Sequence, residues 1–480
     1  MQFFRHFSYR SFLTRAVMGI SALCLFASQG LSVSAATIKE NIARNQALAI
    51  QSNEVANWPT GPVVSAESAI LMDADTGAIL YAKNIHQQEY PASTTKILTT
   101  LIASERCSMD EIVDFSYDAV HDIDPGSNHI AIDPGEQLTM EECLNAILIR
   151  SANEVSFAVA EHISGTTWQD FAPIMNERAK ELGCVDSNFV NPNGLPNEDH
   201  YTSAYDLAMI GRAFFANEAL CKMTMTHMLH ILPSERQPDD IMEVNKMELI
   251  PGGKYAYPYL VGCKTGYTDV ARSTLVSCAE KDGMKLICVV MKDENPNYYE
   301  DTITLFDYGF SNFQRVNISQ TETKYNIENA GSFYSGNDIF GNSKPILELN
   351  QTDSITLPNT ITFQDAVSSI SYDNTEPGQV AVITYTYNDV ALGTASLDFT
   401  AAEKGSSVFR ENTAETTESA EESGATDETQ SGTTTTEADN TETTETAGDN
   451  TGNNGGIPTV AQETSPEEEN STSGGPAVIF

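Results

Sequence analysis

The hydrophobic residues of the chain fall into two patterns between residues 61 and 315. Four short apolar runs are bounded by polar or Gly-containing stretches, as strands are: 69–72, 78–81, 274–279 and 286–291. Between the two pairs of runs, three segments carry apolar residues at helical spacing: 97–102, 144–149 and 155–160. Strands, then helices, then strands predict an α+β fold in which helices pack with an antiparallel sheet.

The rest of the sequence predicts three further regions. A polar segment at 37–60 leads into the apolar region, and short alternating runs at 319–402 predict a small all-β domain. From residue 404 to 480 the chain is rich in Thr, Glu, Ser, Gly and Asn, and apolar residues are few. Such a segment cannot bury enough apolar surface to offset the entropy lost on ordering, so it predicts a disordered tail.

The charge of the chain narrows the classes of partner. Its 480 residues include 26 Lys and Arg against 67 Asp and Glu, a formal net charge of -41. Nucleic-acid binding and polybasic attachment to anionic lipid both need clustered cations, so this balance argues against both. The predicted tail holds 16 of the acidic residues within 411–480 and no basic residue, which leaves -25 for the rest of the chain.

The first 36 residues predict a secretory signal peptide. Three arginines within the first 15 residues precede an apolar run at 16–27, and small residues follow at 33–36. The alternative is an uncleaved N-terminal anchor, although the apolar run is too short to span a bilayer comfortably. The sequence therefore predicts export to the outer face of the cytoplasmic membrane, the cell wall or the medium, and leaves membrane association open.

Seven cysteines lie beyond the predicted signal: Cys107, Cys143, Cys184, Cys221, Cys263, Cys278 and Cys288. Cysteines of an exported protein can form disulfides, and an odd number leaves at least one thiol without an intramolecular partner. We predict a disulfide between Cys107 and Cys143, because the two flank one segment at the edges of neighbouring predicted elements. No CxxC or His-rich spacing indicates a zinc site, so the sequence predicts neither a metal nor a cofactor.

A first candidate for chemistry is Ser93-Thr94-Thr95-Lys96, which directly precedes the helical spacing at 97–102. Residues three apart lie on one face of a helix, so the hydroxyl of Ser93 and the amine of Lys96 can come within hydrogen-bond distance. A lysine serves as a base only when burial or a neighbouring cation lowers its pKa. On its own, this motif is equally typical of the start of a surface helix.

Two further motifs follow along the chain. Ser151-Ala152-Asn153 interrupts two apolar helical stretches, which is typical of a plain turn or of a polar site delivered into a cleft. Lys264-Thr265-Gly266 precedes the predicted strand at 274–279, and its Lys and Thr could bind a carboxylate by charge and hydroxyl. Gly266 would allow close approach of a ligand or another backbone, although an exposed turn has the same composition.

The three motifs together, in this order and separated by 58 and 113 residues, are far more specific than any one of them. The set resembles that of penicillin-binding proteins and serine β-lactamases. The chain resembles most strongly the low-molecular-weight penicillin-binding proteins that act as serine-type D-alanyl-D-alanine carboxypeptidases. The likeness includes 66–73, 191–196 and 262–268, and it runs from about residue 60 to 400, since that family often carries a β-rich second domain. It implies a β-lactamase/transpeptidase-like catalytic domain at 61–315.

The resemblance implies a catalytic role for each member of the first two motifs. Ser93 would attack the carbonyl between the last two D-alanines of a peptidoglycan stem peptide, and Lys96 would take its proton. Water would then hydrolyse the acyl-enzyme. Ser151 would relay the proton to the leaving amine, and Asn153 would bind the substrate backbone.

The third motif is implied to bind the end of the substrate. Lys264 and Thr265, with Gly266, would hold the terminal carboxylate, and the backbone N–H groups of Ser93 and Tyr267 would form the oxyanion hole. β-Lactams mimic the same terminus, so they are implied as covalent inhibitors of Ser93.

The chain departs from the family pattern at two points. Relatives usually have Gly where this chain has Arg272, which questions the turn there but not the motif. Many relatives end in an amphipathic membrane-associated helix, whereas the acidic tail ends at Phe480. The protein is therefore released or held in the wall, or else an anchor that followed residue 480 is missing.

Two other functions remain open on the sequence. A class A β-lactamase needs a Glu-x-x-Leu-Asn motif after Ser151. The segment 141–145 fits this pattern, with Glu141 as its glutamate, but it precedes Ser151. We therefore interpret Glu141 and Glu142 as part of a helix face. The other alternative is a non-catalytic wall-binding scaffold, which the three intact motifs argue against.

Overall fold

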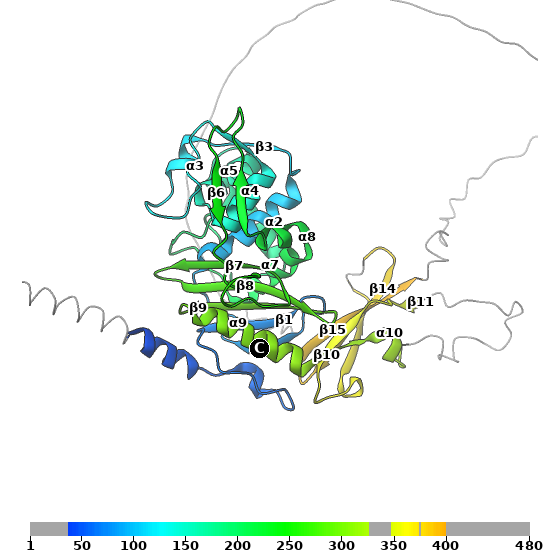
Figure 1. The fold of residues 1–480 in the computed structure, drawn as a ribbon. Helices are drawn as coiled ribbons and strands as arrows, with labels where there is room; N and C mark the ends of the chain where they lie inside the picture. Colours follow the sequence, from blue (N-terminus) through cyan, green and yellow to red (C-terminus); the bar gives the residue numbers. More distant parts are fainter. Residues whose placement is uncertain (1–36, 326–346, 374–375, 400–480) are drawn as a thin grey trace, which may run out of the picture. The chain divides into compact units, whose positions relative to one another are not determined.

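The computed structural model describes residues 37–325, 347–373 and 376–399 (Figure 1). The predicted signal peptide at 1–36 and the predicted tail at 404–480 lie outside these residues. Within them, no helix is both long and apolar enough to cross a membrane.

The centre of the fold is a five-stranded sheet in the order β2-β1-β9-β8-β7, with every neighbouring pair antiparallel. All four runs that the sequence marks as strands belong to it. The strands are β1 (Ser68–Asp73), β2 (Ile79–Lys83), β7 (Leu260–Thr268), β8 (Arg272–Lys281) and β9 (Met284–Asp293). Asp282 and Gly283, both with positive φ, join β8 to β9 as a tight hairpin turn.

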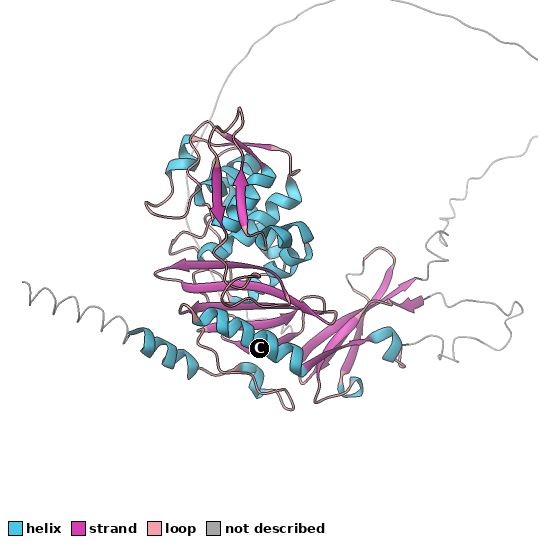
Figure 2. Cartoon of the chain, viewed as in Figure 1, coloured by secondary structure: helices cyan, strands magenta, loops and turns pink. Residues whose placement is uncertain are grey.

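Helices cover both faces of this sheet, as Figure 2 shows. Successive residues of a strand point to opposite faces, and in β1 Ile70 and Met72 enter the core shared with α7 (Ala204–Ala216), whereas Leu71 enters the core shared with α9 (Asn297–Asn312). Because both faces are buried, the strands appear in the sequence as continuous apolar runs rather than as alternating ones.

A group of helices forms the second layer around the core that contains α7. Its helices are α2 (Lys96–Arg106), α3 (Tyr117–His121), α4 (Met140–Asn145), α5 (Asn153–Ser164), α6 (Phe171–Glu181) and α8 (Glu218–Thr224). Two small two-stranded antiparallel sheets accompany them, β3 (Ile112–Asp114) with β4 (Gln137–Thr139) and β5 (Met228–Ile231) with β6 (Ile241–Val244). The prediction of helices packed with an antiparallel sheet is confirmed.

The predicted helix at 144–149 differs in detail. The α-helix ends at Asn145, and residues 146–150 continue it as a wider π-helical turn. The start of α4 is fixed by a capping box, in which the Thr139 N–H donates to Oε2 of Glu142 at 2.8 Å. Glu142 therefore serves the helix end, which agrees with the interpretation of 141–142 as a helix face.

The described part of the region after residue 312 is mostly strand and includes one short α-helix, α10 (Ile318–Thr321). β10 (Phe313–Asn317) pairs with β12 (Ser354–Pro358), and a four-stranded sheet has the order β11-β15-β14-β13. Its strands are β11 (Leu347–Leu349), β13 (Val367–Ser371), β14 (Gln379–Tyr387) and β15 (Val390–Phe399). The division of the chain into domains at the predicted boundaries stays a prediction.

The predicted disulfide between Cys107 and Cys143 is wrong. All seven cysteines of the described residues are free thiols. Cys143 is fully buried in the helical core, whereas Cys107 is only partly buried at the end of α2. Position in the sequence placed both residues at element edges, but it could not show that one of them points inward.

Candidate active site

Ser93 lies on a 3-10 turn, Ala92–Thr95, that leads directly into α2. The Nζ of Lys96, the first residue of α2, is 3.1 Å from the Oγ of Ser93, so the predicted approach of the two groups is confirmed. The turn is held from two sides at the carbonyl of Pro91, which accepts from Thr94 Oγ1 at 2.7 Å and from Thr274 Oγ1 at 3.0 Å. The nucleophile candidate is thus fixed to strand β8 as well as to its own helix.

The amine of Lys96 is fully buried and has three oxygen neighbours. Besides Ser93, it donates to Oδ1 of Asn153 at 2.7 Å and to the backbone carbonyl of Asn193 at 2.6 Å. Burial and, second, the charge of Lys264 lower the pKa of Lys96 well below its ordinary value. The two carbonyl oxygens can only accept, so in the neutral amine they take both N–H groups and the lone pair faces the hydroxyl of Ser93.

Ser151 and Asn153 lie where the π-helical turn gives way to α5. Ser151 has a φ of 63°, a left-handed conformation that a non-Gly residue adopts at a cost in energy, and its side chain is buried. Asn153 is the first residue of α5, and its N–H donates to the carbonyl of Asn128 at 2.9 Å. The strained turn therefore presents both side chains to the same cleft as Lys96.

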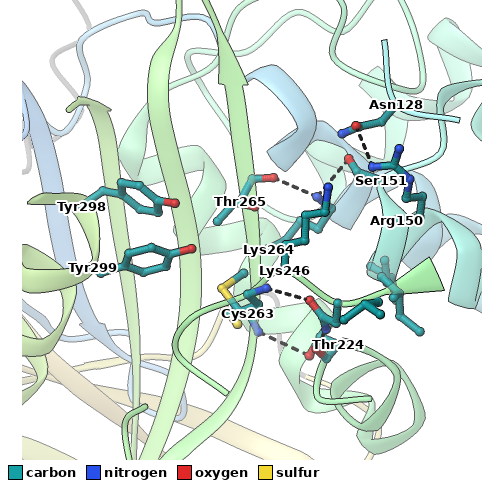
Figure 3. Close-up of a pocket in the computed structure, with 15 residues that line it drawn as sticks. Asn128, Arg150, Ser151, Thr224, Lys246, Cys263, Lys264, Thr265, Tyr298 and Tyr299 are labelled. Atoms are coloured by element: carbon teal, nitrogen blue, oxygen red, sulfur yellow. Dashed lines mark hydrogen bonds between the residues drawn. The ribbon is translucent and has the colours of Figure 1, made fainter. Parts of the chain in front are cut away.

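Lys264 reaches the cleft from β7. Its Nζ donates to Oγ of Ser151 at 3.1 Å and to the carbonyl of Thr265 at 2.8 Å, as Figure 3 shows. Burial lowers the pKa of Lys264 to about 8. Two buried amines in one site cannot both hold a proton at low cost, so we assign the charge to Lys264 and the neutral form to Lys96.

Gly266 allows β7 to pass close to the nucleophile. A Cβ at this position would lie 2.8 Å from the backbone nitrogen of Ser93 and 2.4 Å from Oγ1 of Thr274, which is too close for any side chain. The strand therefore runs against the turn that carries Ser93. This brings the chain at Tyr267 beside that turn. The oxyanion hole of Ser93 and Tyr267 stays a prediction.

These side chains share one cavity of about 400 Å³. It is lined by all the predicted site residues except Lys96, which lies buried behind Ser93: Ser93, Ser151, Asn153, Lys264, Thr265, Gly266 and Tyr267. A smaller cavity of about 230 Å³ shares Ser151, Lys264 and Thr265 and adds two cations, Arg150 and Lys246 (Figure 3). The sequence motifs of three distant segments thus meet at one place.

Asn193 and His200, to which the sequence alone assigned no role, contact residues of the site. The carbonyl of Asn193 accepts from Lys96, and Nε2 of His200 is 2.9 Å from Oγ1 of Thr95, with burial lowering the pKa of His200 to about 3. From the sequence, residues 191–196 belonged only to the family likeness and had no assigned role. The segment 191–196 packs closely against the turn that carries Ser93, because a Cβ at Gly194 would lie 1.8 Å from the carbonyl oxygen of Ala92.

Arg272 stands where relatives usually have Gly, and it leaves the Lys264-Thr265-Gly266 segment of β7 undisturbed. It has a φ of 55° and forms a bidentate pair with Glu294, at 2.6 and 3.2 Å. Strand β7 keeps its pairing with β8 up to Thr268, opposite Arg272. The ion pair therefore anchors the turn that a glycine would otherwise form.

Comparison with known proteins agrees with this geometry. A family model described as D-alanyl-D-alanine carboxypeptidase matches residues 55–295, half of the chain. The chain belongs to the D-alanyl-D-alanine carboxypeptidase family. It is therefore grouped with serine-type hydrolases, and the two alternatives, a β-lactamase and a non-catalytic scaffold, find no support.

Individual relatives give the extent of the likeness. The chain is 37% identical over 252 residues to D-alanyl-D-alanine carboxypeptidase DacF of Bacillus subtilis, a match that covers 52% of this chain and 63% of DacF. It is 32% identical over 263 residues to DacB2 of Mycobacterium tuberculosis, covering 53% of this chain and 84% of DacB2. The chain thus spans somewhat less than two thirds of DacF and most of DacB2.

Solved structures extend the likeness beyond the residues of the family match. Penicillin binding protein 6B from Escherichia coli superposes with a TM-score of 0.52 at 25% identity, covering 71% of this chain and 98% of that protein. Penicillin binding protein 5 from Haemophilus influenzae gives a TM-score of 0.54 at 23% identity and shows the fold alone. The predicted β-lactamase/transpeptidase-like fold is confirmed.

Proposed function

We propose that the protein removes the terminal D-alanine from peptidoglycan stem peptides through an acyl-enzyme on Ser93. The observation that carries this proposal is the environment of Lys96. Its amine is buried and donates to two carbonyl oxygens. The lone pair of the neutral amine therefore faces Oγ of Ser93, 3.1 Å away. A neutral amine so placed takes the hydroxyl proton as Oγ attacks the carbonyl carbon.

The remaining residues serve the later steps. The N–H groups of Ser93 and Tyr267 stabilise the oxyanion, because backbone donors held by the surrounding fold need no reorganisation during the reaction. Ser151 relays the proton that Lys96 took from Ser93 to the leaving D-alanine nitrogen. Its Oγ accepts from Lys264, so its own hydrogen is free for donation, and the proton that replaces it comes from Lys96, which becomes neutral again. Neutral Lys96 then deprotonates the water that attacks the acyl carbonyl, and the proton returns to Oγ of Ser93 as the acyl bond breaks.

Lys264 and Thr265 select the end of the substrate. Lys264 is a cation that lines the cavity, and its partners Ser151 Oγ and the Thr265 carbonyl leave its charge without a carboxylate. The terminal carboxylate of D-alanine supplies this missing negative charge, with the hydroxyl of Thr265 as a second donor. Asn153 gives its amide oxygen to Lys96, so its amide NH₂ is the part that binds the substrate backbone.

We place the protein outside the cytoplasm, in the cell wall or at the outer face of the membrane. The predicted signal at 1–36 and the location of peptidoglycan itself support this placement. Trimming of stem peptides there would limit the peptides available for cross-linking, which connects the activity to cell-wall biogenesis and cell shape.

Covalent labelling with benzylpenicillin tests the proposal. Wild-type protein should gain the mass of one penicilloyl group, Ser93→Ala should gain none, and Ser104→Ala, on the same helix, should be labelled like the wild type. Labelled Ser93→Ala would show a different nucleophile. Rapid destruction of penicillin without a lasting adduct would show a β-lactamase instead.

Release of D-alanine from a pentapeptide ending in D-alanyl-D-alanine completes the test. We expect the wild type to release one D-alanine for each pentapeptide consumed, and Ser93→Ala to release none. Penicillin labelling without D-alanine release would contradict the carboxypeptidase activity and leave only a penicillin binder.

A further inference from the structure

Three side chains of different metal-binding chemistry meet on the helical part of the molecule. Cys107 directly follows α2, Glu111 lies in the turn before β3, and His162 belongs to the last turn of α5. The thiol sulfur, a carboxylate oxygen and an imidazole nitrogen all lie within 4.8 Å of one another. His162 Nε2 and Glu111 Oε2 are 3.0 Å apart.

The spacing suits a tetrahedral ion. Zinc bonds of about 2.0–2.3 Å to N, O and S separate neighbouring ligand atoms by roughly 3.3–3.8 Å, so small side-chain rotations would bring all three atoms into place. The side chains of His162 and Glu111 are 25% and 41% exposed, so an ion can enter and water can complete the coordination.

The turn that carries two of the three groups is already fixed. The N–H of Ser108 donates to Oε1 of Glu111 at 2.7 Å, which leaves Oε2 directed at His162. Backbone bonds attach the same turn to the start of α4, from Met140 N–H to the Glu111 carbonyl at 2.8 Å and from Glu141 N–H to the Met109 carbonyl at 3.0 Å. Binding would therefore order little of the chain, because the ligand arrangement exists beforehand.

We propose that Cys107, Glu111 and His162 bind one zinc ion in a site separate from the catalytic cavity. Thiolate, imidazole and carboxylate are the donor types that zinc takes, whereas calcium and magnesium prefer oxygen alone. On binding, the thiol releases its proton to solvent and the sulfur forms the bond to the metal. The fourth ligand is water.

The position of the site gives it a structural role. α2 begins at Lys96 and has 11 residues, so its end at Cys107 lies about 16 Å from its first turn. α5 begins at Asn153 and carries His162 nine residues later, about 14 Å along its axis. The ion would link the far ends of the two helices whose first residues meet in the catalytic site, and it would not touch substrate.

Zinc titration of the full-length protein under reducing conditions, after chelator treatment, tests the site. Calorimetry should show one equivalent bound, and the melting temperature should rise by about 5–10 °C at zinc 100-fold above Kd, whereas calcium should have no such effect. Cobalt should give a thiolate-to-metal charge-transfer band. A wild-type protein without zinc binding, without the shift or without the band would overturn the proposal.

Matched variants distinguish this site from zinc bound elsewhere. Cys107→Ser and His162→Gln should each weaken zinc binding by more than the roughly 10–100-fold that loss of an outer-shell partner causes. Cys184→Ser, which removes a thiol that contacts the carbonyl of Asp206 instead, should bind like the wild type. Penicillin labelling verifies that every variant is folded. Zinc affinity unchanged in Cys107→Ser and His162→Gln would overturn the proposal.

Discussion

At the scale of single residues, the site depends on two buried lysines that differ in their partners. Lys96 faces a hydroxyl and two carbonyl oxygens, and a second cation nearby disfavours its charged form. Lys264 contacts a hydroxyl and one carbonyl, and burial lowers its pKa only to about 8. The same type of side chain can therefore serve as base in one position and as carboxylate-binding cation in the other.

This difference predicts a bell-shaped pH profile for penicillin acylation. The rate should fall with decreasing pH as Lys96 gains a proton, because only its neutral form accepts the proton of Ser93. It should fall with increasing pH through about 8, because Lys264 then loses its charge. Stopped-flow measurement of the acylation rate across pH checks both limbs.

Substitution separates the two limbs. Lys264→Arg should move the basic limb upward, because arginine stays protonated. Lys96→Arg should lower the rate about 10²–10⁴-fold at every pH, the usual contribution of a general base. Lys180→Arg, an exposed lysine, should leave the profile as it is. A basic limb unmoved in Lys264→Arg would contradict the assignment.

At the scale of elements, the site exists because a strand and two helix starts converge without side chains in the way. β7 approaches the turn of Ser93 closely at Gly266, and the π-helical turn before α5 places Ser151 in a left-handed conformation. The close approach requires that residue 266 has no side chain, and the left-handed conformation of Ser151 costs conformational energy. A strained conformation of this kind persists only where the surrounding packing stabilises it.

Gly266→Ala tests the close approach. The added methyl would press against the Ser93 nitrogen, so the turn must shift, and misplacement by about 1 Å should lower the acylation rate on the order of 10²-fold. Gly165→Ala is the control, because its φ of 72° is strained for Ala but no atom lies within 4 Å of the added Cβ. It should lower stability by about 1 kcal/mol and leave acylation unchanged. Thermal unfolding and acylation kinetics measure the two effects.

The sequence predicted the strands and helices in which most consecutive residues are buried. The strands at 69–72 and 286–291 are buried on both faces, and the helix after Lys96 buries most of its length, so their apolar patterns were complete. The motifs likewise marked the residues that β7, α2 and α5 bring together.

Other features depend on contacts that no local pattern records. The apolar residues of the π-helical turn at 146–150 have the spacing of an α-helix, so the sequence pattern does not distinguish the two. The structure shows the difference, in the wider turn and the left-handed Ser151 that follows it. Asn193 contributes a backbone carbonyl, which carries no residue-specific signal. His162 approaches Cys107 from 55 positions further along the chain, so no spacing motif could have shown their proximity.

At the scale of the whole molecule, the charge of -41 opposes a substrate whose end is itself anionic. The predicted tail accounts for 16 of these charges, and in the proposed function the attraction at the site comes from the buried Lys264. Long-range repulsion between exposed charges is screened by salt, whereas a buried cation is screened much less.

Acylation by benzylpenicillin, which is anionic, should therefore become faster with added salt. We expect a several-fold rise in the second-order rate constant between low and physiological ionic strength, because repulsion during the encounter weakens. A shortened chain ending at residue 410 should show a smaller rise. A rate that falls with salt would contradict this account, since it would mean that exposed cations guide the substrate.

The order of the central sheet has a consequence for how a peptide can bind. β7 is the terminal strand, paired only with β8 among the described strands, and it lines the catalytic cavity from Lys264 to Thr268. An extended peptide can continue the sheet along such an edge through main-chain hydrogen bonds, which do not depend on side-chain identity. The enzyme could then read the last residue by charge while it accepts different residues further up the same peptide.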